Sequence, residues 1–236
     1  MSGDEAAEAR RAEGALSPQG HQGGAGPSAG GRGEGAHHPR SLPDVPIRPA
    51  ATVLLLRTAP SGLEVFVQTR ASGMEFAPDV TVFPGGGIEP SDGDDLRVTA
   101  ARETHEECGV RVHPDDLVPL SRWVTPPGRP RRYDTMFYLA ALPAGQEATC
   151  VTTEAVSAGW HAPQAVIDAW LAGRNKLMAP TYSQLFQLLP FDTVEDVLGW
   201  AAEAADLAPV AIVDGMTREE RRFPGWAEYA EGSTIY

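Results

Sequence analysis

The chain has 236 residues, of which 42% are hydrophobic and 22% charged, proportions typical of a globular protein with one substantial domain. Its formal net charge of −13 argues against a general nucleic-acid-binding protein, because phosphate contacts need clustered Lys and Arg. A phosphorylated small molecule stays compatible with this charge if a divalent cation supplies the positive charge.

The sequence gives no sign of secretion or of membrane insertion. Two cysteines, Cys108 and Cys150, are too few for a disulfide framework, and we expect Cys108 to pack as a small buried hydrophobe. The N-terminus lacks the apolar core of a signal peptide. The longest apolar run, near residues 51–56, is far shorter than the ~20 residues that cross a bilayer. We therefore expect a cytoplasmic protein that needs neither membrane nor nucleic acid.

Residues 1–46 differ in composition from the rest of the chain. The first 40 contain ten glycines, and Met1 and Leu16 are their only larger apolar side chains. Such a segment cannot bury enough surface to offset its ordering entropy, so we predict a disordered tail. An interaction tail or a metal site is the alternative, but the candidate ligands lack any framework around them: His21, His37 and His38.

The next part of the chain alternates short strand-like runs with one acidic helix. Residues 51–57 and 63–69, separated by a Pro-Ser-Gly turn, predict a hairpin. Gly109 is a helix stop signal after an acid-rich stretch. The other predicted elements up to residue 160 are strands at 80–83, 117–124, 133–142 and 154–160 and the acidic helix at 94–108.

Beyond Trp160 the pattern becomes helical, and Asp192 is a plausible N-terminal cap for the last predicted helix. The last fifteen residues contain aromatic side chains that are candidates for packing on the domain or on a partner. The predicted helices are 163–172, 182–189 and 193–205. These elements divide the chain into a tail (1–46), a main domain (47–175) and a helical extension packed on it (176–236).

The acidic helix carries the strongest chemical signal. Glu103, Glu106 and Glu107 are three and four residues apart, so they project from one helical face, where like charges repel. A hard divalent cation with oxygen ligands is the natural partner for such a face. Arg102 precedes Glu106 by four residues and can pair with it. A solvated acidic surface is the competing interpretation.

A glycine-rich loop just upstream weakens that competing interpretation. Gly85 and Gly86 follow a predicted strand and allow the backbone to approach a phosphate closely. Three glycines alone would be weak evidence. Coupled at this distance to Arg-Glu-x-x-Glu-Glu-x-Gly, they are strong evidence for a substrate-binding loop.

The combined motif resembles the Nudix box. Its second half matches position by position at Arg102, Glu103, Glu106, Glu107, Gly109 and Val110. In its first half, Asp92 stands where the box has Glu, and the gap from Asp92 to Arg102 is two residues longer than the family pattern. Thr104 replaces an aliphatic residue.

The resemblance implies an α/β/α sandwich with a mixed sheet and a Mg²⁺- or Mn²⁺-dependent hydrolase that cleaves the diphosphate linkage of a nucleotide derivative. It implies that Glu103 and Glu107 are the main metal ligands and that Glu106 is a further ligand or the base. Arg102 would hold the carboxylates in place. Metal-activated water is chemically suited to such a reaction, since the cation orients the diphosphate and lowers the pKa of the water.

The segment upstream of the box, residues 70–86, is similar to coenzyme A diphosphatases of the peroxisomal type. It keeps the spacing from Arg70 to the glycine loop, which marks Arg70 as a candidate substrate-binding residue. It departs at Glu75, where that group has arginine, and at Asp79, where it has glycine. An acidic residue near a phosphorylated ligand opposes binding, so we expect any coenzyme A hydrolysis to be inefficient.

Two further features have balanced interpretations. Arg129, Arg131 and Arg132 form a basic cluster near Trp123, so that Arg132 would bind substrate phosphates and Trp123 would stack on a base. A solvated hairpin with Trp123 in the core is equally compatible. Glu154 begins a strand where Nudix proteins often carry a substrate or base carboxylate, and an exposed surface Glu is its alternative.

Other functions compete with diphosphate hydrolysis of a coenzyme A-like compound. A clean-up enzyme for nucleoside triphosphates is the second substrate class. A non-catalytic nucleotide sensor is a different class of protein, but it would not need three adjacent carboxylates. The sequence leaves a homodimer open as the assembly.

Deletion of residues 1–44 is expected to leave the melting temperature and kcat nearly unchanged, because this segment has almost nothing to bury. Thermal unfolding and turnover of the full and shortened chains test this expectation. A large drop in either quantity would instead show that the tail docks on the domain.

Overall fold

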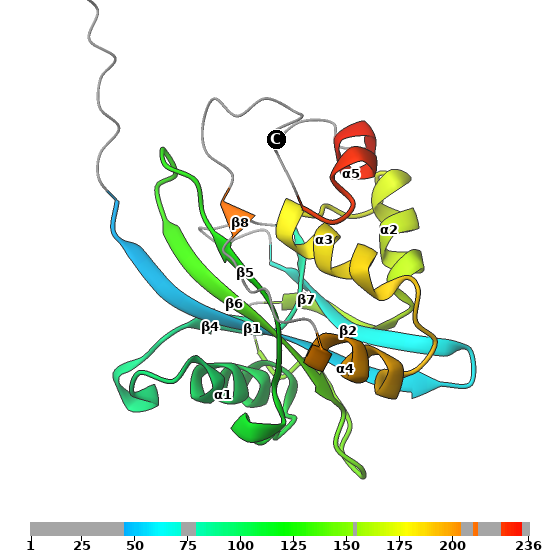
Figure 1. Cartoon of the computed structure of the whole chain (residues 1–236), viewed down its shortest axis with the longest axis horizontal. Helices are drawn as coiled ribbons and strands as arrows, with labels where there is room; N and C mark the ends of the chain where they lie inside the picture. The colour runs from blue at the N-terminus through cyan, green and yellow to red at the C-terminus, as the bar shows by residue number, and fades with distance from the viewer. Residues whose placement is uncertain (1–44, 72–78, 153–154, 204–209, 212–222, 233–236) are drawn as a thin grey trace, which may run out of the picture. The chain divides into compact units, whose positions relative to one another are not determined.

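The computed structural model describes residues 45–71, 79–152, 155–203, 210–211 and 223–232. The described residues form one mixed sheet of eight strands with the order β3-β2-β1-β6-β5-β8, in which β4 also pairs with β1 and β7 with β2 (Figure 1). The strands are β1 (Ile47–Ala59), β2 (Gly62–Arg70), β3 (Thr81–Val82), β4 (Gly85–Gly87), β5 (Val118–Val124), β6 (Arg132–Ala141), β7 (Ala155–His161) and β8 (Val210–Ala211). The helices are α1 (Leu96–Cys108), α2 (Pro163–Leu171), α3 (Ala179–Leu188), α4 (Val194–Glu203) and α5 (Trp226–Gly232), with 3₁₀ turns η1 (Pro90–Asp92) and η2 (Pro114–Asp116).

Strand β1 organises the sheet because it changes partners along one edge. On one side it runs parallel to β6, from Ile47 to Leu56. On the other side its first half pairs with β4 at residues 50–52, and its last four residues pair with β2. At the crossover, the Val53 N–H donates to the Pro84 carbonyl over 2.9 Å. The glycine loop therefore enters the sheet beside β2 as the short strand β4.

Helices cover both faces of this sheet, and the alternation of β1 side chains assigns each face its own core. Val53 and Leu55 face α1, where they pack with Ala100 and Cys108. Leu54 and Leu56 face the other way and share a core with α2, α3 and α4. Figure 1 shows α1 on one side of the sheet and α2, α3 and α5 on the other. The α/β/α sandwich predicted from the sequence is confirmed.

The C-terminal aromatic residues pack on the helical face opposite α1. Tyr229 of α5 stacks on Trp170 of α2 with ring centroids 5.3 Å apart, and its hydroxyl donates to the Leu177 carbonyl over 3.3 Å. Phe223 lies against Trp123 and Trp226. The aromatic residues described near the C-terminus thus complete the core of the domain, whereas Tyr236 lies outside the described residues.

The predicted elements are present, with three differences. The first is α4, which begins after Thr193 rather than Asp192: the Thr193 hydroxyl accepts from the Asp196 N–H and donates to the Asp196 carboxylate. The second is β4, which the sequence did not indicate because glycine-rich runs disfavour strands. The third is a set of short elements that the sequence did not indicate, namely η1, η2, β8 and α5. Of the predicted tail at 1–46, residues 1–44 lie outside the described residues.

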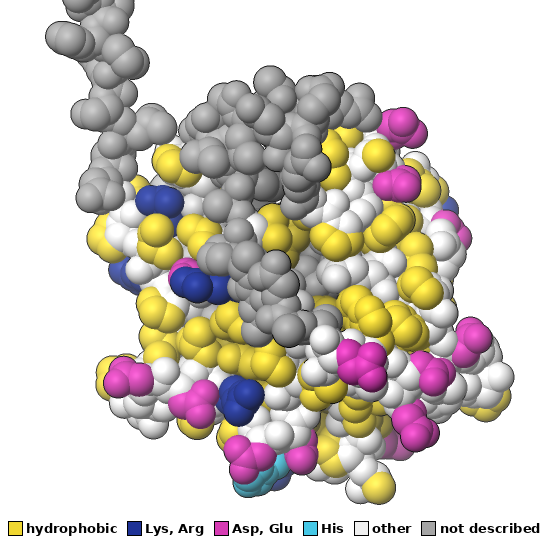
Figure 2. Space-filling view, viewed as in Figure 1, with side chains coloured by type: hydrophobic (Ala, Val, Ile, Leu, Met, Phe, Trp, Pro, Cys, Tyr) yellow, Lys and Arg dark blue, Asp and Glu magenta, His cyan; other side chains and the backbone are white. Residues whose placement is uncertain are grey.

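Acidic side chains outnumber basic ones among the charged residues of the described part. Figure 2 shows Asp and Glu side chains gathered along the lower and right-hand rim of one face, with fewer Lys and Arg. Among the described residues, no helix combines the length and the hydropathy that a bilayer crossing demands.

Candidate active site

Helix α1, which carries the acidic face, is capped at both ends. The Asp95 side chain accepts from the Arg97 N–H at the start, and Gly109, in the left-handed region with φ 73°, donates to the His105 carbonyl at the end. Thr104, which replaces an aliphatic residue of the motif, is fully buried, and its hydroxyl donates to the Ala100 carbonyl over 2.7 Å. The substitution therefore leaves no unsatisfied hydroxyl in the core.

Glu107 is the buried member of the acidic face, with an exposed fraction of 7%. Its Oε2 accepts from Gln68 Nε2 of β2 over 2.6 Å and from the Gly85 N–H of β4 over 3.0 Å. These donors come from the two strands that share one edge of β1. One carboxylate oxygen thus joins α1, β2 and β4, which orients Glu107 before any ligand is present.

Glu103 lies under the glycine loop. A Cβ added at Gly86 would overlap the Glu103 carboxylate, and a Cβ at Gly85 would lie 2.6 Å from Thr52 Oγ1. Gly85 is therefore required by close packing on the β1 backbone, where an added Cβ would also overlap the Ala51 carbonyl oxygen, whereas Gly86 lies directly against the Glu103 carboxylate. Burial raises the pKa of the Glu103 carboxyl, and the adjacent Arg102 guanidinium offsets part of this effect. The environment of Glu103 accordingly favours a nearby positive charge.

Arg102 connects the acidic face to the turn η1. Its guanidinium forms a two-point ion pair with Asp92, with both Nε and Nη2 at 2.9 Å from carboxylate oxygens, and Nη2 also donates to the Gly87 carbonyl. Nη1 donates to Glu103 over 2.9 Å and to Glu106 over 3.0 Å. The predicted Arg102–Glu106 contact is confirmed, but Glu106 is the exposed member, with 56% of its side chain accessible.

Asp92 was not singled out as a site residue, yet it fixes the loop. It is buried and accepts from the Glu89 N–H and the Thr99 hydroxyl as well as from Arg102. The longer gap between Asp92 and Arg102 is taken up by Gly93, Asp94 and Asp95, which lie between η1 and α1. The extra length therefore leaves the Asp92–Arg102 ion pair intact.

The remaining candidate residues lie in different surroundings. Arg70 ends β2, and its buried Nε has no hydrogen-bond partner among the described residues. Arg132 donates from Nε to the Thr125 carbonyl of its own hairpin over 3.2 Å. Trp123 is 6% exposed and packs against Phe223, so it belongs to the core. The alternative prediction, that Trp123 stacks on a substrate base, is wrong because stacking would require an exposed ring. Glu154 and Glu75 lie outside the described residues.

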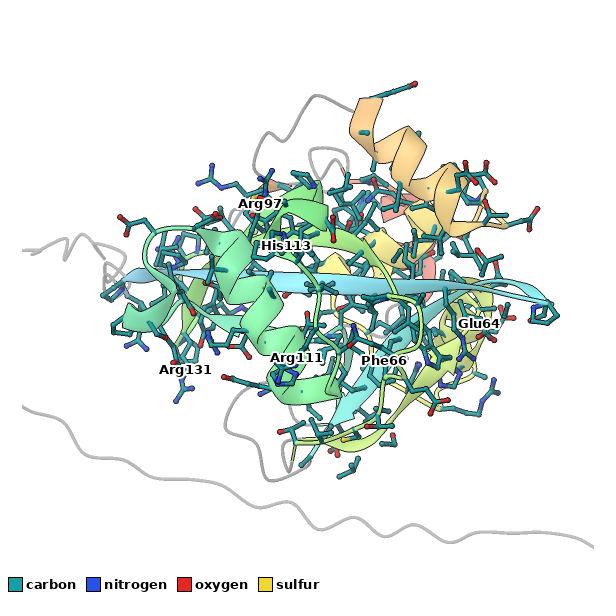
Figure 3. All side chains as sticks on the ribbon, turned by 90° about the horizontal axis from the view of Figure 1, so that it is seen from below. Glu64, Phe66, Arg97, Arg111, His113 and Arg131 are labelled. Carbon is teal, nitrogen blue, oxygen red and sulfur yellow. The ribbon has the colours of Figure 1, made fainter. Side chains whose placement is uncertain are left out.

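Figure 3 looks at the α1 side of the sheet and separates these regions. Arg131, in the basic cluster, lies at the opposite end of the molecule from Glu64, which is close to the β1–β2 turn. Phe66 of β2 belongs to the core that α1 covers. His105 of α1 is half-buried, and its Nδ1 has no partner among the described residues.

A hollow of about 420 Å³ opens near the start of α1, between that helix and strands β1, β5 and β6. Ile88, Leu96 and Met136 form its apolar lining, and the ion-paired Arg122 and Asp134 form part of its rim. Its lining contains none of the three glutamates of the acidic face.

The donor set of the acidic face suits a hard cation, although its side chains have other partners in the structure. Within the described ranges, no three His, Cys, Asp or Glu side chains are grouped so as to hold a metal ion. Glu103 and Glu106 share Arg102, and a cation would compete with that guanidinium for their oxygens. Three carboxylates, two of them largely withdrawn from solvent, are nevertheless the ligands that Mg²⁺ and Mn²⁺ prefer.

Comparison with known proteins gives consistent matches over this region. The model of the Nudix domain family matches residues 46–185. The putative nudix hydrolase 7 of Caenorhabditis elegans is 26% identical over 187 residues, which cover 63% of this chain and 62% of that protein. The peroxisomal coenzyme A diphosphatase ndx-8 of the same organism is 36% identical over 83 residues, 33% of this chain and 36% of that protein. The chain thus spans less than two thirds of either relative.

Solved structures agree on the architecture. A Nudix hydrolase from Alicyclobacillus acidocaldarius superposes with a TM-score of 0.59 at 26% identity and covers 66% of this chain and 97% of its own. The Nudix domain of Shewanella oneidensis NrtR, solved with ADP-ribose, has a TM-score of 0.50 at 16% identity and covers 61% of this chain and 88% of its own. The second likeness concerns the fold alone.

The Asp92–Arg102 ion pair makes stability depend on pH. The hydrogen bond from Arg102 is the largest cause that holds the pKa of Asp92 at about 2, below its ordinary 3.8. A carboxyl with a depressed folded-state pKa stabilises the fold above its unfolded pKa and loses that contribution as pH falls toward the folded value. Asp92→Asn is therefore expected to lower the free energy of unfolding by about 2 kcal/mol at pH 7, with the difference shrinking between about pH 4 and pH 2.

Urea unfolding at pH 7, 4 and 2.5 measures this difference. Asp116→Asn, a change at an exposed carboxylate in η2, is the control and should alter stability little at any of these values. An Asp92→Asn penalty that stays constant down to pH 2.5 would contradict the assignment.

Proposed function

The chain belongs to the Nudix domain family, and on that premise we propose that it is a hydrolase that cleaves the diphosphate linkage of a nucleoside diphosphate derivative with bound Mg²⁺ or Mn²⁺. The observation that carries this proposal is the packing of Gly86 on Glu103, beside the buried Glu107. A glycine loop that closely approaches two desolvated carboxylates can bring a cation and a phosphate together. A plain acidic surface would give no reason for a glycine loop to lie against these carboxylates.

The metal would be held by α1. In this proposal Glu103 and Glu107 are the main ligands, and Glu106 is a further ligand or the base that takes a proton from water. A bound divalent cation would neutralise phosphate charge, orient the diphosphate and lower the pKa of its water. The partial burial of Glu103 and Glu107 supports their assignment, because a carboxylate removed from water gains most from a nearby cation.

In this proposal Arg102 orients the carboxylates of the site and does not contact the substrate. Four of its hydrogen bonds go to carboxylate oxygens, and Asp92 receives two of these. The arginine therefore sets where Glu103 and Glu106 point and keeps the glycine loop against the helix. Glu154 stays a candidate base or substrate contact: the described residue next to it, Ala155, pairs with Arg70 at the edge of β2.

The substrate would contact the glycine loop and the end of β2. Gly85 and Gly86 are candidates for phosphate contacts through the backbone, and the half-buried Arg70 at the end of β2 is a candidate cation for a phosphate oxygen. Coenzyme A or an acyl-coenzyme A is the substrate class we propose, supported by the partial match to a protein named peroxisomal coenzyme A diphosphatase. We expect its hydrolysis to be inefficient, because Glu75 stands where that group has arginine. Arg132 is a weaker candidate for phosphate binding than Arg70, because its Nε already donates to the Thr125 carbonyl.

A substrate screen tests the reaction and its specificity together. Coenzyme A, acetyl-coenzyme A, ADP-ribose, NADH, dinucleoside polyphosphates and nucleoside triphosphates would be incubated with and without Mg²⁺, and products identified by mass. Cleavage of a diphosphate linkage that requires the metal is the expected result. Turnover confined to triphosphates would replace the substrate class, and specific binding without turnover of any compound would indicate a sensor.

Glu107→Gln is expected to lower kcat on the order of 10²-fold or more while the protein stays folded. The change keeps the shape of the side chain and removes the charge that would hold the cation. Steady-state kinetics at several Mg²⁺ concentrations, with circular dichroism as a check of the fold, measure the effect. The control is Glu195→Gln, an exposed glutamate of α4, which should keep wild-type turnover.

Near-wild-type turnover of Glu107→Gln at saturating Mg²⁺ would show that the metal assignment is wrong.

A further inference from the structure

Gln68 of β2 makes one side-chain contact that the motif does not include. Its Nε2 donates to Glu107 Oε2 over 2.6 Å, between two side chains that are 3% and 7% exposed. The residues are 39 positions apart in the chain. We propose that Gln68 is a positioning residue, which holds the Glu107 carboxylate in the orientation that a divalent cation needs. The inference rests on the proposed function, in which Glu107 is a metal ligand.

The backbone of Gln68 is fixed on both sides. It pairs with Val82 of β3 on one side and with Ala158 of β7 on the other. A side chain that starts from a doubly paired strand and is closed off from solvent has few rotamers available. The Gln68 amide is therefore a rigid donor, and it transmits the position of β2 to the carboxylate on α1.

The chemistry of this donor suits a metal ligand. The Gln68 amide and the Gly85 N–H are both neutral donors, so they orient Oε2 without placing a positive charge at the carboxylate. A cationic donor in the place of Gln68 would compete with a metal ion for the same charge. Outer partners that orient a ligating carboxylate commonly change metal affinity by about 10- to 100-fold when they are removed.

The contact is also specific to Glu107. Among the described residues, Gln68 Oε1 has no hydrogen-bond partner, so the amide is not part of a wider polar network in the core. The side chain is held at this depth by its bond to the carboxylate. A glutamine that served only the packing of β2 would be replaceable by an apolar side chain without effect on α1.

Binding of Mn²⁺ to the full-length protein, followed by electron paramagnetic resonance, tests the proposal without relying on activity. Gln68→Met keeps the length of the side chain and removes the donor, and Gln68→Leu is a second variant. Both are expected to raise the Kd for Mn²⁺ about 10-fold or more. In turnover, each should need more Mg²⁺ for half-maximal rate, whereas a purely structural role would change the melting temperature alone.

Gln184→Leu is the matched control. Gln184 of α3 is also fully buried and also has one unpartnered amide atom, but it bonds to Gln187 on the face opposite α1. It should bind Mn²⁺ like the wild type, even if it melts at a lower temperature. Glu107→Gln provides the limit of lost binding.

The outcomes separate the two proposals. Absence of Mn²⁺ binding by the wild type would overturn the proposed metal site itself. Wild-type binding that is unchanged in a folded Gln68→Met or Gln68→Leu protein would overturn only the role of Gln68. If neither Gln68 variant folds while Gln184→Leu does, Gln68 serves the core, and the positioning role is likewise rejected.

Discussion

The arrangement of the candidate site depends on one carboxylate oxygen, Oε2 of Glu107. It accepts from β2 and from β4, and these two strands meet β1 along the same edge, one after the other. A sheet in which one strand ends and another begins leaves backbone and side-chain donors at the junction that no ladder can satisfy. Glu107 accepts two of them. Helix α1 is thus attached to the sheet at the point where the glycine loop joins it.

The charged residues of the site have two different roles. The Asp92–Arg102 ion pair anchors the loop, whereas Glu103, Glu106 and Glu107 form the acidic face. Asp92 is buried and takes two bonds from the guanidinium, so its charge serves to anchor the loop. The same guanidinium reaches Glu103 and Glu106 with its other nitrogen. Because the anchor needs only the two ends of the loop to meet, the extra residues between Asp92 and Arg102 are accommodated. The departure from the family spacing therefore leaves the acidic face unchanged.

Much of the fold and part of the site could be predicted because their signals are local. The helix spacing placed Glu103, Glu106 and Glu107 on one face, and strand alternation predicted the hairpin. The mixed sheet was implied by the resemblance to the Nudix box. Gln68 could not be found in this way, because its partner is 39 residues away and a lone glutamine in a strand has no distinctive pattern. Trp123 had two equal interpretations, and only the position of Phe223 decided between them. The strand β4 was missed because its pairing comes from the geometry of β1 rather than from the propensity of glycine.

The two faces of the sheet have different tasks, and this division explains how the chain tolerates an unfavourable acidic helix. Carboxylates three and four residues apart repel, and the burial of Glu103 adds a desolvation penalty that Arg102 only partly offsets. The opposite face carries no such cluster of like charges: the α2–α4 core is mainly apolar, with a few buried polar side chains such as Gln184, and is closed by Phe223, Trp226 and Tyr229. Stability gained there allows α1 to keep a charge arrangement that local rules disfavour. A site that violates those rules on one face, supported by a consistent core on the other, is the arrangement expected where a binding partner of opposite charge completes the structure.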